Sequence, residues 1–178
     1  CVAGAAAIVK PGVKNWTCGA DDAFGWEGVA AIKKEAEGLG AEVVLEESAE
    51  PAATDITSNL QKSIEAKPDY LFVVWAGANS PWNQISDLKM QEKGIKISTG
   101  APDIPALSIM EPLVGMEGFS VYYHTLPDNE VNDWLVKEHK DRYNGDVPDL
   151  FTTGGMSAAI AIVEALKKYE GDADGNKM

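Results

Sequence analysis

The sequence is poor in the residues that most often carry out chemistry in enzymes. It has two cysteines, two histidines and a single arginine, Arg142, among 178 residues. His124 and His139 lie on different expected elements with no cysteine or carboxylate at ligand spacing, so we expect no zinc site. The glycine-rich phosphate-binding motifs and the Gly-x-Ser-x-Gly motif are also missing. These absences argue against an enzyme, and the sequence suggests no cofactor.

Basic residues and long apolar runs are scarce as well. Lysine and arginine number 15 against 28 aspartates and glutamates, which gives a formal net charge of −13. A nucleic-acid partner requires clustered basic side chains, so this balance argues against that class of partner. No stretch of about 18 consecutive apolar residues occurs, and we therefore expect no membrane-spanning segment. Residues 1–9 are apolar but lack a basic flank, so they do not have the pattern of a signal peptide.

The two cysteines, Cys1 and Cys18, leave two interpretations open. A pair of cysteines can form a disulfide. Two thiols in a domain with an apolar core are also commonly just small buried residues.

What the sequence does contain is an alternation of short apolar runs with amphipathic helix patterns. Residues 70–75 are apolar without alternation, which is typical of a central strand in a parallel sheet covered by helices. Apolar residues at 26–39 recur at helical spacing, and Gly40 supplies a stop. The pattern predicts an α/β fold, a flavodoxin-like or Rossmann-like parallel β-sheet flanked by helices. Strands are expected at 13–18, 41–45, 70–75, 95–97 and 118–123, and helices at 3–10, 26–39, 56–66, 81–93, 104–114, 131–143 and 157–169.

Small, polar and aromatic residues follow several of the expected strands. In an open parallel sheet the ligand crevice lies beyond the carboxyl ends of the strands. Clefts for small molecules combine aromatic walls with a few polar groups. We therefore expect ligand contacts from residues of these loops, namely Phe24, Trp75, Gly77, Ala78, Asn79, Asp103 and Tyr122.

Several of these residues have a purely structural alternative. Phe24 could only cover the start of the following helix, and Trp75 could be a core residue at the end of its strand. Asp103 could cap the helix expected to begin at Ile104, which is a common role for aspartate before a helix. Tyr122 and Tyr123 would point to opposite faces of a strand, so at most one of them would face a ligand.

A series of motifs along the chain resembles one protein family. The sequence Lys-Pro-Gly-Val-Lys at 10–14 is followed by Gly-Ala-Asp-Asp-Ala-Phe-Gly at 19–25, and further motifs follow at 52–56, 67–75 and 102–103. In their order and spacing these motifs resemble the second lobe of the type I periplasmic substrate-binding proteins of ABC importers. Among these, the group of leucine/isoleucine/valine-binding proteins is the most similar. The resemblance covers nearly the whole chain but only about half of the family's usual length.

The resemblance implies a solute-binding protein, not an enzyme. Such a protein holds a small polar solute, here an amino acid or related compound, between two lobes and delivers it to the membrane permease of an ABC transporter. It implies a periplasmic location, or in a Gram-positive host an extracellular protein tethered to the membrane. Phe24 would border the solute, and the loop at 77–79 would contact it. Asp103 would stand where leucine-type binders carry the glutamate that meets the ammonium group of the solute.

The same resemblance divides the chain into three segments. Residues 1–12 would be the end of a helix from a missing first lobe, because no capping residue precedes its apolar positions and Pro11 and Gly12 stop it. Residues 13–125 would form the α/β ligand-binding lobe. Residues 126–178 would contain helices that return toward the first lobe, with 154–157 as capping residues, and a polar tail.

Two alternatives come from other functional classes. The first is a ligand-sensing module of a receptor or regulator, because the same lobes are reused there. The second is an enzyme of flavodoxin-like fold, which the absent phosphate-binding loop and the few histidines and cysteines oppose.

Overall fold

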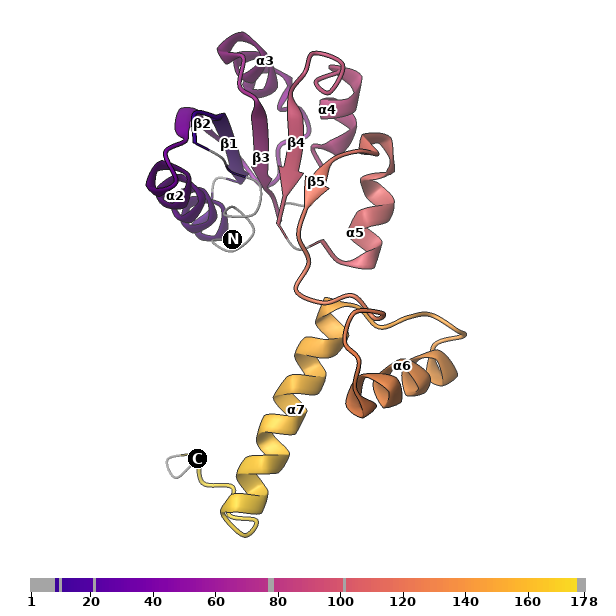
Figure 1. Cartoon of the computed structure of the whole chain (residues 1–178). Helices are drawn as coiled ribbons and strands as arrows, with labels where there is room; N and C mark the ends of the chain where they lie inside the picture. The colour runs from indigo at the N-terminus through magenta and orange to yellow at the C-terminus, as the bar shows by residue number, and fades with distance from the viewer. Residues whose placement is uncertain (1–8, 10, 21, 77–78, 101, 176–178) are drawn as a thin grey trace. The chain divides into compact units, whose positions relative to one another are not determined.

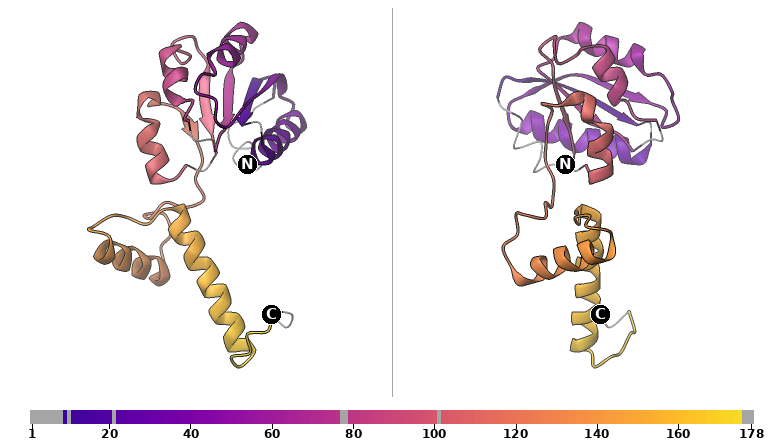
Figure 2. Two further views of the ribbon diagram at one scale, coloured as in Figure 1. Left: turned by 180° about the vertical axis from the view of Figure 1, so that it is seen from behind. Right: turned by 90° about the vertical axis from the view of Figure 1, so that its right-hand side faces the viewer.

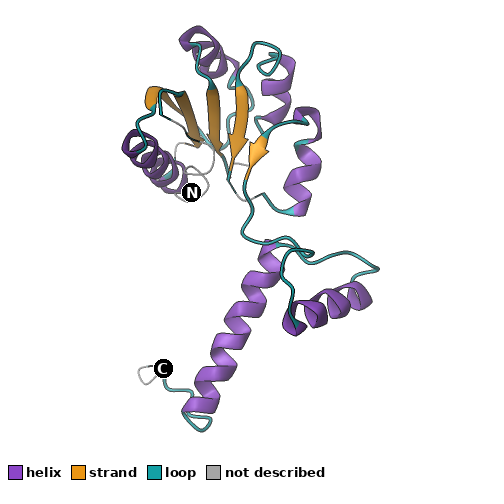
Figure 3. Ribbon diagram, viewed as in Figure 1, coloured by secondary structure: helices purple, strands orange, loops and turns teal. Residues whose placement is uncertain are grey.

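The apolar run that follows Asp69 forms the centre of a parallel sheet in the computed structural model, which describes residues 9, 11–20, 22–76, 79–100 and 102–175. All five residues of β3 (Tyr70–Val74) are buried. The strands beside it are β1 (Lys14–Ala20) and β4 (Lys96–Thr99). With β2 (Glu42–Ala49) and β5 (Glu117–Gly118), the described part of the chain forms a five-stranded sheet in the order β2-β1-β3-β4-β5, with every pair parallel (Figure 3). The expected α/β fold is confirmed.

Helices connect the strands and cover both faces of the sheet. They are α2 (Ala23–Gly38), α3 (Thr57–Ala66), α4 (Trp82–Asp87), α5 (Ile104–Ile109) and the 3-10 helix η1 (Glu111–Leu113). On one face, Ile32 of α2 packs with Phe72 of β3. On the other face, α3, α4 and η1 pack with Leu71 and Val73 (Figures 1 and 2). Successive residues of β3 thus enter two separate apolar cores, which explains why its sequence is apolar without alternation.

The chain divides into two compact units, Cys1–Phe119 with the sheet and Ser120–Met178. The second unit contains α6 (Glu130–Arg142) and α7 (Leu150–Lys168). Asn129 caps α6, because its side chain accepts a hydrogen bond from the N–H of Asn132. The expected helix end at 3–10 and Cys1 lie outside the described residues.

The start of α7 differs from the expectation. Asp149 caps this helix, because its Oδ1 accepts hydrogen bonds from the N–H groups of Phe151 and Thr152. The helix therefore begins at Leu150 and not at Ser157, and residues 154–157 lie inside it. The interpretation of 154–157 as capping residues was wrong, because Asp149 satisfies the N-terminal N–H groups about two turns earlier.

By length and composition alone, α7 is able to cross a membrane, with a mean hydropathy of 1.2. Its sequence contains no long run of consecutive apolar residues, because threonines, glycines and a serine interrupt its apolar positions. A helix that packs in the interior of a protein satisfies the same criterion, so this property alone does not assign α7 to a membrane.

Three other expected elements are shorter in the structure. The helix expected to reach Gly94 ends at Asp87, because Lys89 adopts a left-handed backbone with φ of +52°. The helix expected at 104–114 ends at Ile109, and η1 follows as a separate turn. The strand expected at 118–123 consists of Glu117–Gly118 alone. Beyond it, the hydroxyl of Ser120 donates a hydrogen bond to the carbonyl of Tyr122 and accepts one from the N–H of Tyr122. These local bonds compete with strand pairing.

Gly28 is a point of close approach between α2 and β3. A Cβ at this position would lie 2.7 Å from Cγ1 of Val74, a β-branched residue that is 6% exposed. Gly28→Ala is therefore expected to lower the free energy of unfolding by about 1–3 kcal/mol, the usual cost of overpacking. This loss is expected although alanine is the better helix former by about 1 kcal/mol. Urea denaturation measures the difference.

Gly38, near the end of the same helix, provides the matched control. No atom lies within 4 Å of a Cβ at this position. Gly38→Ala is expected to raise the free energy of unfolding by up to about 1 kcal/mol. Equal changes in the two variants would contradict the close contact between α2 and β3.

Candidate functional site

The candidate site lies along the carboxyl edge of the sheet, defined here as the loops at 21–22, 50–56, 75–81 and 100–103. From β1 the chain turns outward to β2 through α2, whereas β3 continues in the opposite direction to β4. The carboxyl ends of β1 and β3 therefore flank a topological switch point, where open α/β sheets form their ligand crevice. Phe24, Trp75, Asn79 and Asp103 all follow strands that end at this edge. Gly77 and Ala78 lie outside the described residues.

Phe24 stands in the first turn of α2. Asp22 caps this helix, and its Oδ1 accepts a hydrogen bond from the N–H of Gly25 at 2.8 Å. The Phe24 side chain is 59% exposed. An aromatic ring so exposed gains little from packing within this unit, so it is available to contact a ligand.

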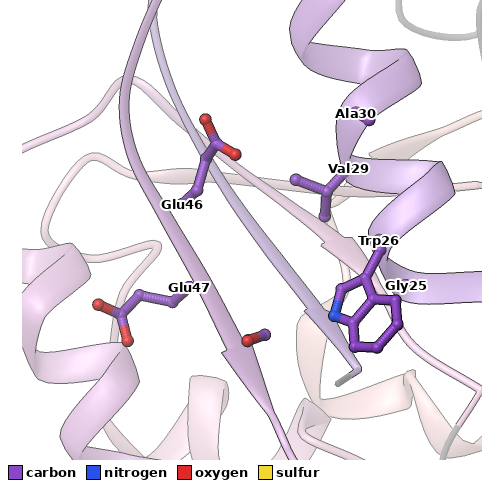
Figure 4. Close-up of a pocket in the computed structure, with 7 residues that line it drawn as sticks. Gly25, Trp26, Val29, Ala30, Glu46 and Glu47 are labelled. Atoms are coloured by element: carbon purple, nitrogen blue, oxygen red, sulfur yellow. The ribbon is translucent and has the colours of Figure 1, made fainter. Parts of the chain in front are cut away.

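A small cavity of about 220 Å³ opens between the first turns of α2 and the end of β2 (Figure 4). Trp26 lines it and is 57% exposed. Glu46 and Glu47 also line it and point to opposite sides of the strand. Lys33 donates a hydrogen bond to Glu46, and this bond raises the pKa of Lys33. Glu47 pairs with Lys62. Because both carboxylates already have cationic partners, this cavity does not offer a free anionic group.

The loop after β3 is held by its own side chains. The indole Nε1 of Trp75 donates a hydrogen bond to the carbonyl of Asn79 at 2.7 Å. The Nδ2 of Asn79 donates to the carbonyl of Ala52 at 3.1 Å. Trp75 is half-buried and packs against the core on the α3 and α4 side. The alternative role of Trp75 as a core residue is therefore confirmed in part. Its ring packs against the core, and its indole nitrogen bonds the loop after β3.

Asp103 caps α5. Its Oδ1 accepts a hydrogen bond from the N–H of Ala106 at 2.7 Å. The carboxylate has a second oxygen, and no bond to this oxygen occurs among the described residues. A carboxylate accepts several hydrogen bonds, so the cap and a ligand ammonium can use different oxygens of Asp103.

Tyr122 belongs to the second unit. Its hydroxyl donates to Oδ1 of Asn132 at 2.7 Å, and burial raises its pKa. Asn132 also donates to the carbonyls of His124 and Pro127. Residues 120–123 form no strand, so Tyr122 and Tyr123 do not alternate across a sheet as the sequence had predicted.

The charge of the carboxyl edge is one-sided. The four loops contain five acidic residues and no lysine, arginine or histidine. The acidic residues are Asp21, Asp22, Glu50, Asp55 and Asp103. A hydrogen bond from Thr57 lowers the pKa of Asp55, which favours its charged form. Among the described residues, no group of three histidines, cysteines or carboxylates is placed to hold a metal ion. The ionisable side chains of these four loops are therefore all acidic.

Comparison with known proteins decides the family. The chain matches the model of the family described as periplasmic binding protein over residues 1–178. The chain belongs to this family. No curated protein matches it significantly.

Solved structures of solute-binding proteins are similar to this periplasmic binding protein. One is an ABC-type branched-chain amino acid transporter from Rhodopseudomonas palustris CGA009, with 40% sequence identity and a TM-score of 0.85 over 99% of this chain and 48% of that one. Another, from R. palustris BisB5 in complex with 3,4-dihydroxybenzoic acid, has 28% identity and a TM-score of 0.76 over 97% and 48%. A third, from R. palustris in complex with benzoate, has 24% identity and a TM-score of 0.78 over 97% and 47%, and shows the fold alone. The chain spans about half the length of each of these structures.

One residue that contacts the carboxyl edge in this periplasmic binding protein was not expected from the sequence. Gln84 of α4 bonds the backbone of both Thr54 and Ile56. A glutamine in the first turn of a short helix has no local pattern that distinguishes it from a solvated residue. Only the folded structure shows which backbone groups its amide reaches.

Proposed function

We propose that this chain is a ligand-binding lobe of the solute-binding component of an ABC importer, and that its solute carries an ammonium group, as an amino acid does. The charge of the carboxyl edge carries the proposal, because five carboxylates without a basic side chain favour a cation. Benzoate and dihydroxybenzoate, the ligands named for two similar structures, present a carboxylate instead. A carboxylate at this edge would meet like charge, so we favour an amino acid or a related compound.

In this proposal the site residues form one wall of a cleft. Phe24 and Trp75 provide aromatic surface, and Asp103 provides a carboxylate for the ammonium group. The loop from Gly77 to Asn79 would contact the solute as well, and Tyr122 stays a predicted ligand contact. The chain would work with a first lobe that supplies the facing wall and closes over the solute by a hinge motion.

The division of the chain follows from the same proposal. Residues 1–12 would be the end of a helix from the first lobe, 13–125 would form the ligand-binding lobe, and 126–178 would return toward the first lobe. The exposed apolar side chains of α7, among them Ile162 and Val163, fit a helix that packs against protein there. The match to a solved structure covers 99% of the chain, so α7 falls within the part that resembles that protein. The further partner would be a membrane permease, and the location periplasmic or extracellular.

Titration calorimetry of the intact protein against amino acids, amides and aromatic acids tests this function. We expect an amino acid to bind at least about 100-fold more tightly than benzoate, because a buried charge pair contributes several kcal/mol. Binding of benzoate alone would contradict the solute class and keep the importer function. No binding across the whole panel would contradict the function itself.

A further inference from the structure

The side chain of Gln84 joins α4, which follows β3, to the loop after β2. The strands β2 and β3 are not adjacent in the sheet. Its Nε2 donates a hydrogen bond to the carbonyl of Thr54 at 3.1 Å, and its Oε1 accepts one from the N–H of Ile56 at 2.8 Å. Thr54 and Ile56 follow β2, whereas Gln84 follows β3, and β1 lies between these strands in the sheet. A single side-chain amide therefore spans from α4 to the start of α3.

Asn79 makes a second tie, between the loop after β3 and the loop after β2. Its side-chain Nδ2 donates a hydrogen bond to the carbonyl of Ala52. Its backbone carbonyl accepts a hydrogen bond from the indole N–H of Trp75. One N–H of the Asn79 side-chain amide is thus used by the protein backbone. Its position is coupled to Trp75 on one side and to the loop after β2 on the other.

The chemistry of the Gln84 contact requires an amide. The start of α3 has no capping side chain of its own at Ile56, a residue that is 2% exposed. Its N–H therefore depends on an acceptor from elsewhere, because a buried unpaired N–H is unfavourable. The carbonyl of Thr54 needs a donor at the same place. Glutamine and asparagine alone carry a fixed donor and a fixed acceptor on one planar group, and glutamine has the longer reach.

We infer that Gln84 is a positioning residue of the solute site. Without touching the solute, it fixes the loop after β2 against α4, and with Asn79 it fixes the position of Trp75 on the wall of the cleft. Asn79 accordingly also acts by holding this loop in place. This inference rests on the proposed function.

Affinity measurements on the intact protein test this inference, with L-leucine as the probe or the tightest-binding amino acid of the panel above. Gln84→Leu is expected to lower the affinity about tenfold, since it removes both hydrogen bonds and leaves the N–H of Ile56 unpaired. Gln91→Leu is the matched control. Gln91 also bonds a backbone carbonyl, that of Val114, but lies away from the carboxyl edge. The control is expected to change affinity less than twofold.

Gln84→Glu separates positioning from stability. The carboxylate keeps an acceptor for the N–H of Ile56 and stands favourably at the N-terminus of α3, so the melting temperature is expected to stay near that of the unchanged protein. It loses the donor to Thr54 and repels that carbonyl, so the affinity is still expected to fall severalfold. Unchanged affinity in Gln84→Glu and Gln84→Leu would overturn the inference and leave Gln84 with a stabilising role only.

Hydrogen exchange distinguishes this failure from a failure of the proposed function. In Gln84→Leu the amide of Ile56 is expected to exchange at least about tenfold faster, while the amides of β3 keep their protection. If no probe binds even the unchanged protein, the solute-binding proposal fails and this exchange result still decides whether the tie exists. Unchanged exchange at Ile56 would overturn the inference in either case.

Discussion

Replacing Leu71 with alanine is expected to lower the free energy of unfolding by about 2–5 kcal/mol. Leu71 lies on the central strand β3, is 0% exposed, and packs in the core that α3, α4 and η1 share with the sheet. Alanine would leave a cavity at the middle of this core, and β3 pairs on both sides and cannot shift to fill it. Urea denaturation monitored by tryptophan fluorescence and by circular dichroism measures the loss.

Leu107→Ala is the control for this substitution. Leu107 lies on α5 and is 52% exposed, so the same chemical change removes little buried surface. We expect a change within about 0.5 kcal/mol. A similar loss in both variants would mean that Leu71 does not occupy the centre of the core.

The strands that the sequence predicted best are those buried on both faces. For β3, both cores require apolar residues, so the run at 70–75 leaves no other interpretation. The edge strand β2 was predicted only to residue 45, whereas it continues to Ala49. An edge strand pairs on one side, and its second half carries glutamates that reach lysines in α2 and α3. The pattern of apolar residues therefore does not reveal the second half of this strand.

The ends of the elements were harder to predict because single side chains decide them. Asp149 starts α7 one turn or more before the periodic apolar residues, and two glycines inside the helix do not stop it. The bonds of Ser120 to Tyr122 end β5 after two residues. In each case a local hydrogen bond outweighs the intrinsic preference of the neighbouring residues.

The position of the candidate site followed from topology, because loops after parallel strands always gather at one edge. The hydrogen bonds within the site could not be predicted from topology. The Gln84 amide reaches Ile56 across 28 residues, and no short-range pattern reports such a contact. The sequence left two roles open for Asp103, a ligand contact and a helix cap. In the structure the cap of α5 uses only one carboxylate oxygen, Oδ1.

Asp103→Asn is expected to weaken the binding of an amino-acid solute by about 2–5 kcal/mol, the cost of removing one partner from a desolvated charge pair. The substitution separates the two roles of Asp103. Asparagine caps helices as well as aspartate does, so the bond to the N–H of Ala106 and the stability of α5 are expected to persist. Only the negative charge is lost. Calorimetry on the intact protein measures the affinity, and thermal unfolding without solute is expected to stay within about 0.5 kcal/mol of the unchanged protein.

Asp55→Asn shows whether contact or general charge is responsible. Asp55 is a carboxylate of the same edge that likewise accepts a backbone N–H, that of Thr57, and it lies exposed in the loop after β2. Screening by water and salt makes an exposed charge contribute little at a distance, so we expect less than about a threefold change in affinity. Equal losses in the two variants would assign the preference for a cation to the summed field of the edge. Full affinity in Asp103→Asn would restrict Asp103 to its role as the cap of α5.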